Sequence, residues 1–193
     1  AAVEIGDGIR QLISIQDEIF NAPFFATAQL LLAGSDAQGL RYGTVGTPER
    51  PFVEWKDEDP PPGELAPGAL LDRPVAQLLR KDRLLDLIRN FVIFDAGIKK
   101  VPRQHQFKGV KLAQERLAKR EGGVIWHTQG SGKSILMVLL AKWILEREPD
   151  ARVLIVTNRD ELDRQIEGVM RNAGVIGTEA PSPRVTRRDE FVS

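Results

Sequence analysis

The feature that most constrains the fold of this sequence is a glycine-rich loop between an apolar run and a long apolar helix. The loop is 127–134, with the sequence HTQGSGKS; an expected strand, 123–126, precedes it and an expected helix, 135–144, follows it. Nucleotide phosphates need several backbone N–H groups that converge on one point, and a Cβ atom at Gly130 or Gly132 would obstruct that approach. The position of the loop between strand and helix predicts a phosphate-binding site.

The residues that close the loop suit the same chemistry. Lys133 supplies a positive charge for the β and γ phosphates, and the Ser134 hydroxyl is a ligand for a bridging Mg²⁺. The start of the following helix adds its positive end. His127 stands where the usual pattern has its first glycine, so an ordinary glycine turn between core elements is the alternative.

A second strand and helix follow the first pair. The continuous apolar run 152–157 is typical of a parallel strand covered on both faces. The helix after it is expected to start with Asp160 as N-cap and to stop at Gly174. Two consecutive strand–helix units favour an α/β fold with an open parallel sheet and helices on both faces.

The first half of the chain has a different pattern. A helix is expected over 7–20, short strands and turns over 24–55, a stiff polar linker over 56–63 and a second helical region over 78–94. Residues 99–120 are rich in Lys and Arg, which fits a solvated helix face or a DNA contact equally well.

Composition excludes only a few kinds of function for this chain. The formal net charge is zero, so any surface for nucleic acid must be local, and the chain has no cysteine for disulfides or thiolate chemistry. No apolar run approaches the roughly 18 residues that span a bilayer. These observations predict a cytoplasmic protein without a membrane partner, and the first and last residues suggest that both ends are cuts.

Three segments in order, 101–106 (VPRQHQ), 123–134 (GVIWHTQGSGKS) and 153–159 (VLIVTNR), resemble the restriction (R) subunit of type I restriction-modification enzymes. In that family a nuclease domain precedes two helicase-like motor domains of superfamily 2, which use ATP to pull DNA before cleavage. The HTQ opening of the loop, unusual in general, is what the first motor motif of this family carries.

The resemblance implies roles for individual residues. Lys133 is the expected catalytic residue, Ser134 holds Mg²⁺ through the nucleotide, and Gln106 recognises adenine through paired hydrogen bonds. The expected ATP-binding residues are Gln106, His127, Thr128, Gln129, Gly130, Ser131, Gly132, Lys133 and Ser134. The expected DNA contacts are Thr157, Asn158 and Arg159. ATP and Mg²⁺ are the implied cofactors, and double-stranded DNA and the specificity and methyltransferase subunits are the implied partners.

The resemblance also implies a domain plan. Residues 1–56 correspond to the α+β end of a restriction-endonuclease-like domain, and 57–98 to a linker and helical connector. Residues 99–193 correspond to the first, incomplete part of a RecA-like ATP-binding domain with a parallel sheet. The order of Tyr42, Trp55 and the stretch 84–91 fits this plan.

The sequence departs from the family pattern at three positions. Ile15 replaces an expected tyrosine four residues after Gln11, Asn158 replaces a common acidic residue, and Gly109 replaces an alanine. The metal-binding acids and lysine of the nuclease are expected before Ala1.

Two acidic patterns could be mistaken for catalytic ones. Asp36 with 54–56 (EWK) has the form that metal-dependent nucleases use to bind Mg²⁺. A surface charge cluster is the favoured interpretation, because the resemblance places Trp55 and Lys56 beyond the nuclease site. Asp189 and Glu190 are paired acids, yet 184–188 before them is no buried strand. A motor needs such a strand to complete its Mg²⁺ site, so we expect this piece alone to be inactive.

Two other functions stay open. A small P-loop kinase would need an acceptor pocket and a lid after the loop, whereas this chain has its extra length before it. A non-enzymatic nucleotide- or DNA-binding module is favoured by the missing strand with paired acids.

Overall fold

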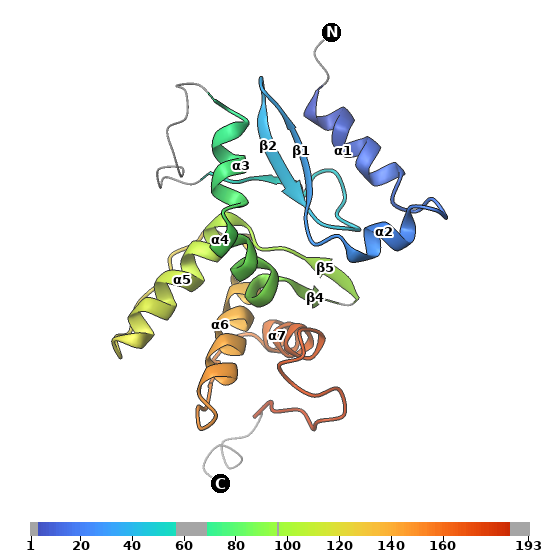
Figure 1. Cartoon of the computed structure of the whole chain (residues 1–193). Helices are drawn as coiled ribbons and strands as arrows, with labels where there is room; N and C mark the ends of the chain where they lie inside the picture. Colours follow the sequence, from blue (N-terminus) through green and yellow to red (C-terminus); the bar gives the residue numbers. More distant parts are fainter. Residues whose placement is uncertain (1–3, 57–68, 96, 186–193) are drawn as a thin grey trace. The chain divides into compact units, whose positions relative to one another are not determined.

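The computed structural model describes most of the 193-residue chain, namely residues 4–56, 69–95 and 97–185. Helices and short strands make up a mixed α/β structure (Figure 1). The chain divides into two compact units, Ala1–Ile93 with Ile98–Lys108, and Phe94–Gly97 with Gly109–Ser193. Each unit buries its own set of apolar side chains. The domain boundaries expected after residues 56 and 98 stay predictions.

Three strands of the first unit form an antiparallel sheet in the order β1-β2-β3, with bounds Leu31–Ser35, Gly39–Gly43 and Val53–Glu54. β1 and β2 pair from Leu31 opposite Gly43 to Ser35 opposite Gly39. Gly39 closes the turn with a φ of 79°, a conformation that glycine adopts without a Cβ penalty. The strands expected over 24–55 are therefore confirmed.

Helix α1 (Ile5–Ser14) packs against β1, and its apolar side chains form a hydrophobic core with those of the sheet. The core side chains are Ile5, Ile9, Phe25, Leu31, Ala33 and Phe52. The helix expected over 7–20 ends early, and Ile19 is 86% exposed. The buried side chain of Gln16 explains the stop, because it donates to the Leu12 carbonyl at 2.9 Å and accepts from the Gly46 N–H at 2.9 Å. These bonds hold the chain after α1 on a neighbouring turn.

The remaining elements up to the segment 101–106 and α5 are short helices and one two-stranded sheet, β4-β5. The elements are α2 (Ala22–Thr27), α3 (Asp72–Leu78), α4 (Lys81–Asp86), the π-helical turn η1 (Leu87–Phe91), β4 (Ile93–Asp95), β5 (Ile98–Lys100) and α5 (Gln104–Ala118). Only the first residue of β4 and the first five residues of α5, Gln104–Lys108, belong to the first unit. The expected helical region 78–94 is thus broken into pieces and ends in a strand. Residues 57–63 of the expected linker lie outside the described residues.

The second unit is built on two long helices that pack together. They are α6 (Lys133–Arg147) and α7 (Asp160–Asn172), which confirm the two helices expected after the apolar runs. Their buried apolar side chains are Leu136, Val138, Leu139, Ala141, Ile166 and Val169. Asp160 is the first residue of α7 rather than its N-cap, a position that Arg159 occupies. Gly174 follows the helix with a φ of 71°, as expected of a terminator.

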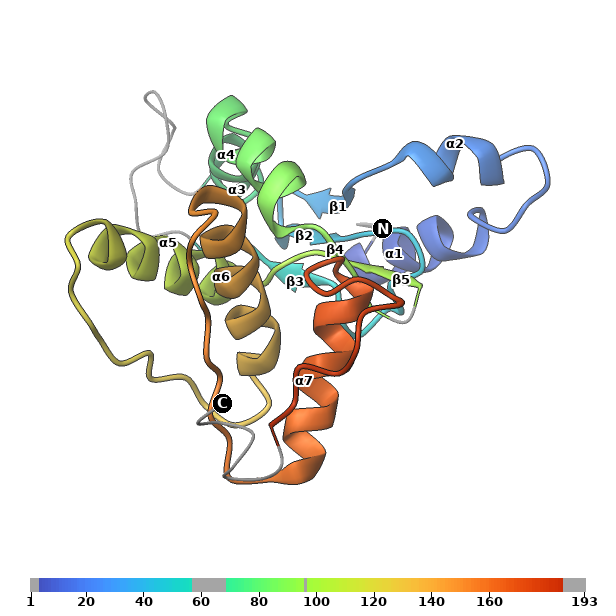
Figure 2. The same cartoon turned by 90° about the horizontal axis from the view of Figure 1, so that it is seen from below.

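The parallel sheet expected from the sequence is not present among the described residues. Segments 123–126 and 152–157 are extended but pair with no strand, and both run without arrows in Figure 2. Val124 is 87% exposed, Trp126 91% and Val156 82%. A strand needs a neighbour for its backbone N–H and C=O groups, and all strand pairs that the structure describes involve β1 to β5.

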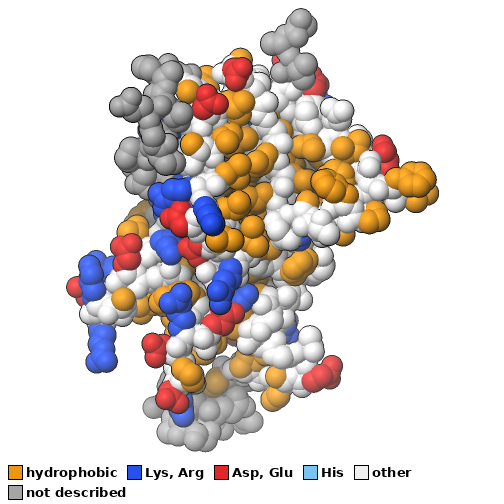
Figure 3. Space-filling view, in the orientation of Figure 1, with side chains coloured by type: hydrophobic (Ala, Val, Ile, Leu, Met, Phe, Trp, Pro, Cys, Tyr) orange, Lys and Arg blue, Asp and Glu red, His pale blue; other side chains and the backbone are white. Residues whose placement is uncertain are grey.

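The surface of the first unit is uneven. Hydrophobic side chains gather over β1, β2 and α2 in Figure 3. Exposed aromatic side chains near α2 include Phe20, at 95%, and Phe24, at 70%. Among the described residues, none of the helices combines the length and the apolar character needed to cross a bilayer.

Candidate nucleotide-binding site

Two glycines of the loop 127–134 have a backbone conformation that other residues rarely adopt. Gly130 has a φ of 76° and Gly132 a φ of 80°, both in the left-handed region. An L-residue pays roughly 1–2 kcal/mol for that conformation. A Cβ atom at Gly130 would meet no described protein atom within 4 Å, so within the chain itself it is the backbone conformation that favours glycine there. Helix α6 begins directly after Gly132.

The Lys133 side chain folds back over the loop that precedes it. Its Nζ donates to the carbonyl oxygen of His127 at 3.1 Å and to that of Thr128 at 2.9 Å. The side chain is nevertheless exposed. The Lys133 ammonium therefore lies at the edge of the loop. An anion bound by the loop N–H groups would be close enough to accept a charged hydrogen bond from it.

The start of α6 adds a second source of positive potential. The helix has 15 residues and no acidic residue in its first turn, and Gly132 provides no side-chain cap. Its first N–H groups and its dipole therefore favour an anion at this end. Ser134, the expected Mg²⁺ ligand, lies half-buried in the same turn.

Gly109 explains how α5 approaches the loop. A Cβ atom at this position would lie 3.0 Å from the Leu136 Cδ1 and 3.3 Å from the His127 Cε1. Glycine in place of the alanine of the family pattern thus allows the His127 ring and helix α6 to lie close to the α5 backbone at Gly109. His127, Thr128, Gln129, Gly130, Ser131, Gly132, Lys133 and Ser134 are brought together in one loop and helix start.

Gln106 lies in the first unit, whereas the loop lies in the second. Its side chain is 4% exposed, and its Oε1 accepts the Arg103 N–H at 2.8 Å. This bond is the helix-side half of a capping box, in which the third residue of a helix satisfies the N-cap N–H. Gln106 is therefore a fixed, buried side chain at the start of α5, not a solvated one.

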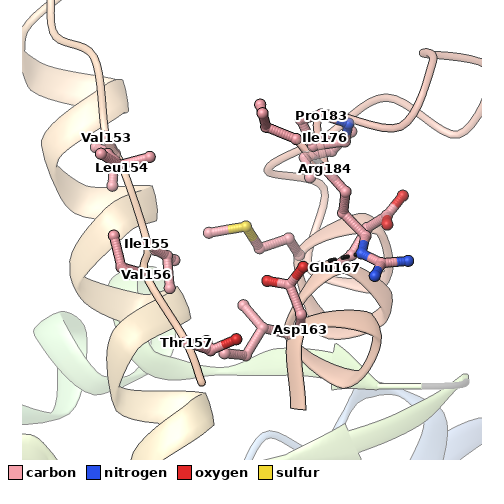
Figure 4. A pocket seen from close by; sticks show the side chains of 13 residues that line it. Val153, Leu154, Ile155, Val156, Thr157, Asp163, Glu167, Ile176, Pro183 and Arg184 are labelled. Carbon is pink, nitrogen blue, oxygen red and sulfur yellow. Dashed lines mark hydrogen bonds and ion pairs between the residues drawn. The ribbon is translucent and has the colours of Figure 1, made fainter. Parts of the chain in front are cut away.

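The expected DNA-contacting residues, 157–159, close the segment 152–157 and connect it to α7. The Thr157 Oγ1 donates to the Arg159 carbonyl at 3.2 Å, and the side chains of Asn158 and Arg159 are exposed. Beside them, an open cavity of about 560 Å³ separates 153–157 from the face of α7 (Figure 4). Apolar side chains of the segment and of α7 line most of it.

Acidic residues of α7 pair with three arginines, one of which, Arg164, lies 2.6 Å from Asp160. Arg184 pairs with Asp160 and, at 2.9 Å, with Asp163, and Arg171 lies 2.8 Å from Glu167. The Arg171 hydrogen bond, followed by that from Ser182, lowers the pKa of Glu167. Among the described residues near the expected DNA contacts, much of the arginine charge is therefore balanced within the unit.

The acidic pattern at 54–56 is a surface charge cluster in this structure. Glu54 lies 2.9 Å from the Lys56 Nζ and 3.8 Å from Arg41. Within the described ranges, no group of three or more metal-binding side chains occurs. Asp189 and Glu190 lie outside the described residues.

Sequence patterns missed the contribution of Tyr42 to this region. Its hydroxyl donates to the Pro102 carbonyl at 2.8 Å, just before α5, across 60 residues of sequence. A signal was present, because Tyr42 is the chain's only tyrosine and lies in a strand whose residues are all buried except Arg41.

Comparison with known proteins gives the same picture as the motifs. Residues 105–192 match the SWI2/SNF2 ATPase family. The endonuclease subunit of the type I restriction enzyme HindI of Haemophilus influenzae is 32% identical over 182 residues, which cover 86% of this chain and 17% of that protein. No solved structure matches significantly.

Two putative type I restriction enzyme endonuclease subunits of Methanocaldococcus jannaschii are also similar. MjaVIIIP is 34% identical over 108 residues, and MjaIXP is 35% identical over 115 residues; the matches cover 49% and 53% of this chain. The chain spans only 11% of each of these two relatives. The similarity to endonuclease subunits of type I restriction enzymes, joined to a helicase-like ATPase match, is therefore confirmed for this chain.

Proposed function

We propose that this chain is part of the ATP-dependent DNA-translocating and DNA-cleaving subunit of a type I restriction-modification system, and that 127–134 binds the phosphates of ATP. The observation that carries the proposal is the loop geometry. Two left-handed glycines, a lysine ammonium hydrogen-bonded to loop carbonyls and the start of a long helix converge there. The ATPase family match and the named relatives support the same activity.

The donor set fits ATP with Mg²⁺. The Lys133 ammonium stabilises the negative charge on the β and γ phosphates in the transition state. Lys133 is therefore the catalytic residue of this region. Ser134 supplies a hydroxyl oxygen, a ligand type that Mg²⁺ accepts. Gln106 recognises adenine, and His127, Thr128, Gln129 and Ser131 complete the phosphate loop. When bound there, Mg²⁺ would supply a Lewis acid for the phosphate oxygens.

The remaining roles belong to the longer protein. We propose that 123–126 and 152–157 are parallel strands of a RecA-like domain whose neighbouring strands lie in the rest of the subunit. Thr157, Asn158 and Arg159 then contact double-stranded DNA. The specificity and methyltransferase subunits are the partners, the cytoplasm is the compartment, and the nuclease acids lie elsewhere in the protein.

The test is DNA-stimulated ATP hydrolysis by the full-length protein, compared between wild type, Lys133→Ala and Lys142→Ala. Lys142 is the second lysine of α6 and pairs with Glu146 at 3.9 Å, so its variant controls for loss of a helix charge. We expect Lys133→Ala to lower turnover about 100-fold or more, because one preorganised charge is lost at the reacting phosphate. Lys142→Ala should retain the wild-type rate.

Other outcomes point to other functions. ATP turnover that is indifferent to DNA but follows a small-molecule phosphate acceptor would favour the kinase. Nucleotide binding with no turnover in the full-length protein would favour a non-enzymatic module.

A further inference from the structure

A buried aromatic cluster lies in the first unit, under the start of α5. Its members are Tyr42, Trp55, Phe91 and Phe107. The ring centroids of Trp55 and Phe107 are 5.6 Å apart, and those of Phe91 and Phe107 are 4.7 Å apart. The Arg83 guanidinium lies 5.2 Å from the Trp55 ring centroid and donates to the Gln77 carbonyl at 2.9 Å. The four rings are buried and contact one another in a chain from Tyr42 through Trp55 and Phe107 to Phe91.

Tyr42 is the member of this cluster that reaches the backbone before α5. Its hydroxyl donates to the Pro102 carbonyl at 2.8 Å and is buried. Burial raises the pKa of Tyr42, while a hydrogen bond from the Gln104 backbone and the charge of Arg103 act in the opposite direction. The hydroxyl therefore faces the turn that begins the helix, and it stays protonated as a donor.

Gln106 is held between two contacts of this cluster. Pro102, four residues before it, accepts the Tyr42 bond, and Phe107, immediately after it, is one of the clustered rings. The Gln106 Oε1 is itself oriented by the Arg103 N–H. That bond fixes the orientation of the Gln106 amide relative to the turn.

We infer that Tyr42 is a positioning residue for base recognition, since it fixes the turn 102–104 that aims the Gln106 amide; this inference rests on the proposed function. A glutamine amide pairs with adenine by accepting from its amino group and donating to N7. Guanine presents an oxygen in place of that amino group. Such pairing is sensitive to small displacements of the amide.

The test measures equilibrium binding of ATP and of GTP to the full-length protein and to Tyr42→Phe, which keeps the ring and removes the hydroxyl. The inference predicts about fivefold weaker ATP binding with GTP binding unchanged, so the ATP preference falls by the same factor. Gln106→Ala should show the same pattern to a larger extent.

Thr44→Val is the matched control. Thr44 is also fully buried at the end of the same sheet, and its hydroxyl donates to the Gln29 carbonyl at 2.9 Å, away from α5. This variant likewise removes one buried hydroxyl, and it should leave the ATP preference at the wild-type value. A purely structural role for Tyr42 would make the two variants behave alike.

The outcomes distinguish failure of the positioning role of Tyr42 from failure of the proposed function. If Gln106→Ala loses the ATP preference and Tyr42→Phe keeps it, or if Tyr42→Phe weakens ATP and GTP equally, this inference is overturned and the proposed function stands. If the wild-type protein shows no ATP preference, or if Lys133→Ala binds ATP as tightly as wild type, both are overturned.

Discussion

Single residues at the start of α5 and α6 determine which hydrogen-bonding groups each helix presents to a ligand. At α6, Gly130 and Gly132 take left-handed conformations that free the path to the loop N–H groups. At α5, the Gln106 amide serves as part of the cap and is therefore buried and oriented before any ligand binds. The phosphate loop could be predicted from its sequence because its requirements are local. The Tyr42 contact could not, since its partner lies 60 residues away.

The burial of Tyr42 predicts a pH dependence of stability. Its pKa is raised above the ordinary value of 10.0, mainly because burial disfavours the phenolate. Above that value the unfolded chain releases a proton that the folded chain keeps, so the stability falls as the pH rises. Below it both states are protonated, and Tyr42 adds no pH dependence.

Urea unfolding of wild type and Tyr42→Phe at about pH 9 and about pH 11 checks this expectation. The wild type should lose more stability than the variant between the two conditions. Since Tyr42 is the only tyrosine of the sequence, tyrosinate absorbance of the folded 193-residue chain reports on it directly. Ionisation of the folded chain at the ordinary pKa would contradict the buried donor.

At the scale of elements, the two long helices of the second unit were predictable, and the expected parallel sheet is not present among the described residues. Helices α6 and α7 follow from apolar spacing and from local stops, because a helix satisfies its own backbone. The runs 123–126 and 152–157 have the composition of buried strands, but a strand depends on neighbours that its own sequence does not specify. Apolar side chains of these runs, such as Val124 and Val156, are exposed among the described residues, where the runs pair with no strand.

Hydrogen exchange tests the proposal that these runs are strands of a larger sheet. In the 193-residue chain, amides of 123–126 and 152–157 should exchange quickly, because they pair with no strand among the described residues. In the full-length protein the same amides should be strongly protected. Amides of α6 serve as the internal reference, since their hydrogen bonds lie within the helix in both proteins. Equal exchange of the two runs in both proteins would contradict a parallel sheet.

At the scale of the whole molecule, this chain combines two compact units with different tasks in the proposed subunit. The first contains the antiparallel sheet, the aromatic cluster and Gln106, and the second contains the phosphate loop and the paired helices α6 and α7. Because the chain spans 17% of the length of its Haemophilus influenzae relative, turnover and cleavage are proposed for the complete protein.

The most direct test of the central claim is equilibrium binding of ATP to the full-length protein in three forms: wild type, Lys133→Ala and Lys142→Ala. Loss of the charged hydrogen bonds of Lys133 should weaken binding by about 10-fold or more, while Lys142→Ala should bind as wild type does. Equal ATP affinity of wild type and Lys133→Ala would contradict the claim that 127–134 is the phosphate-binding loop.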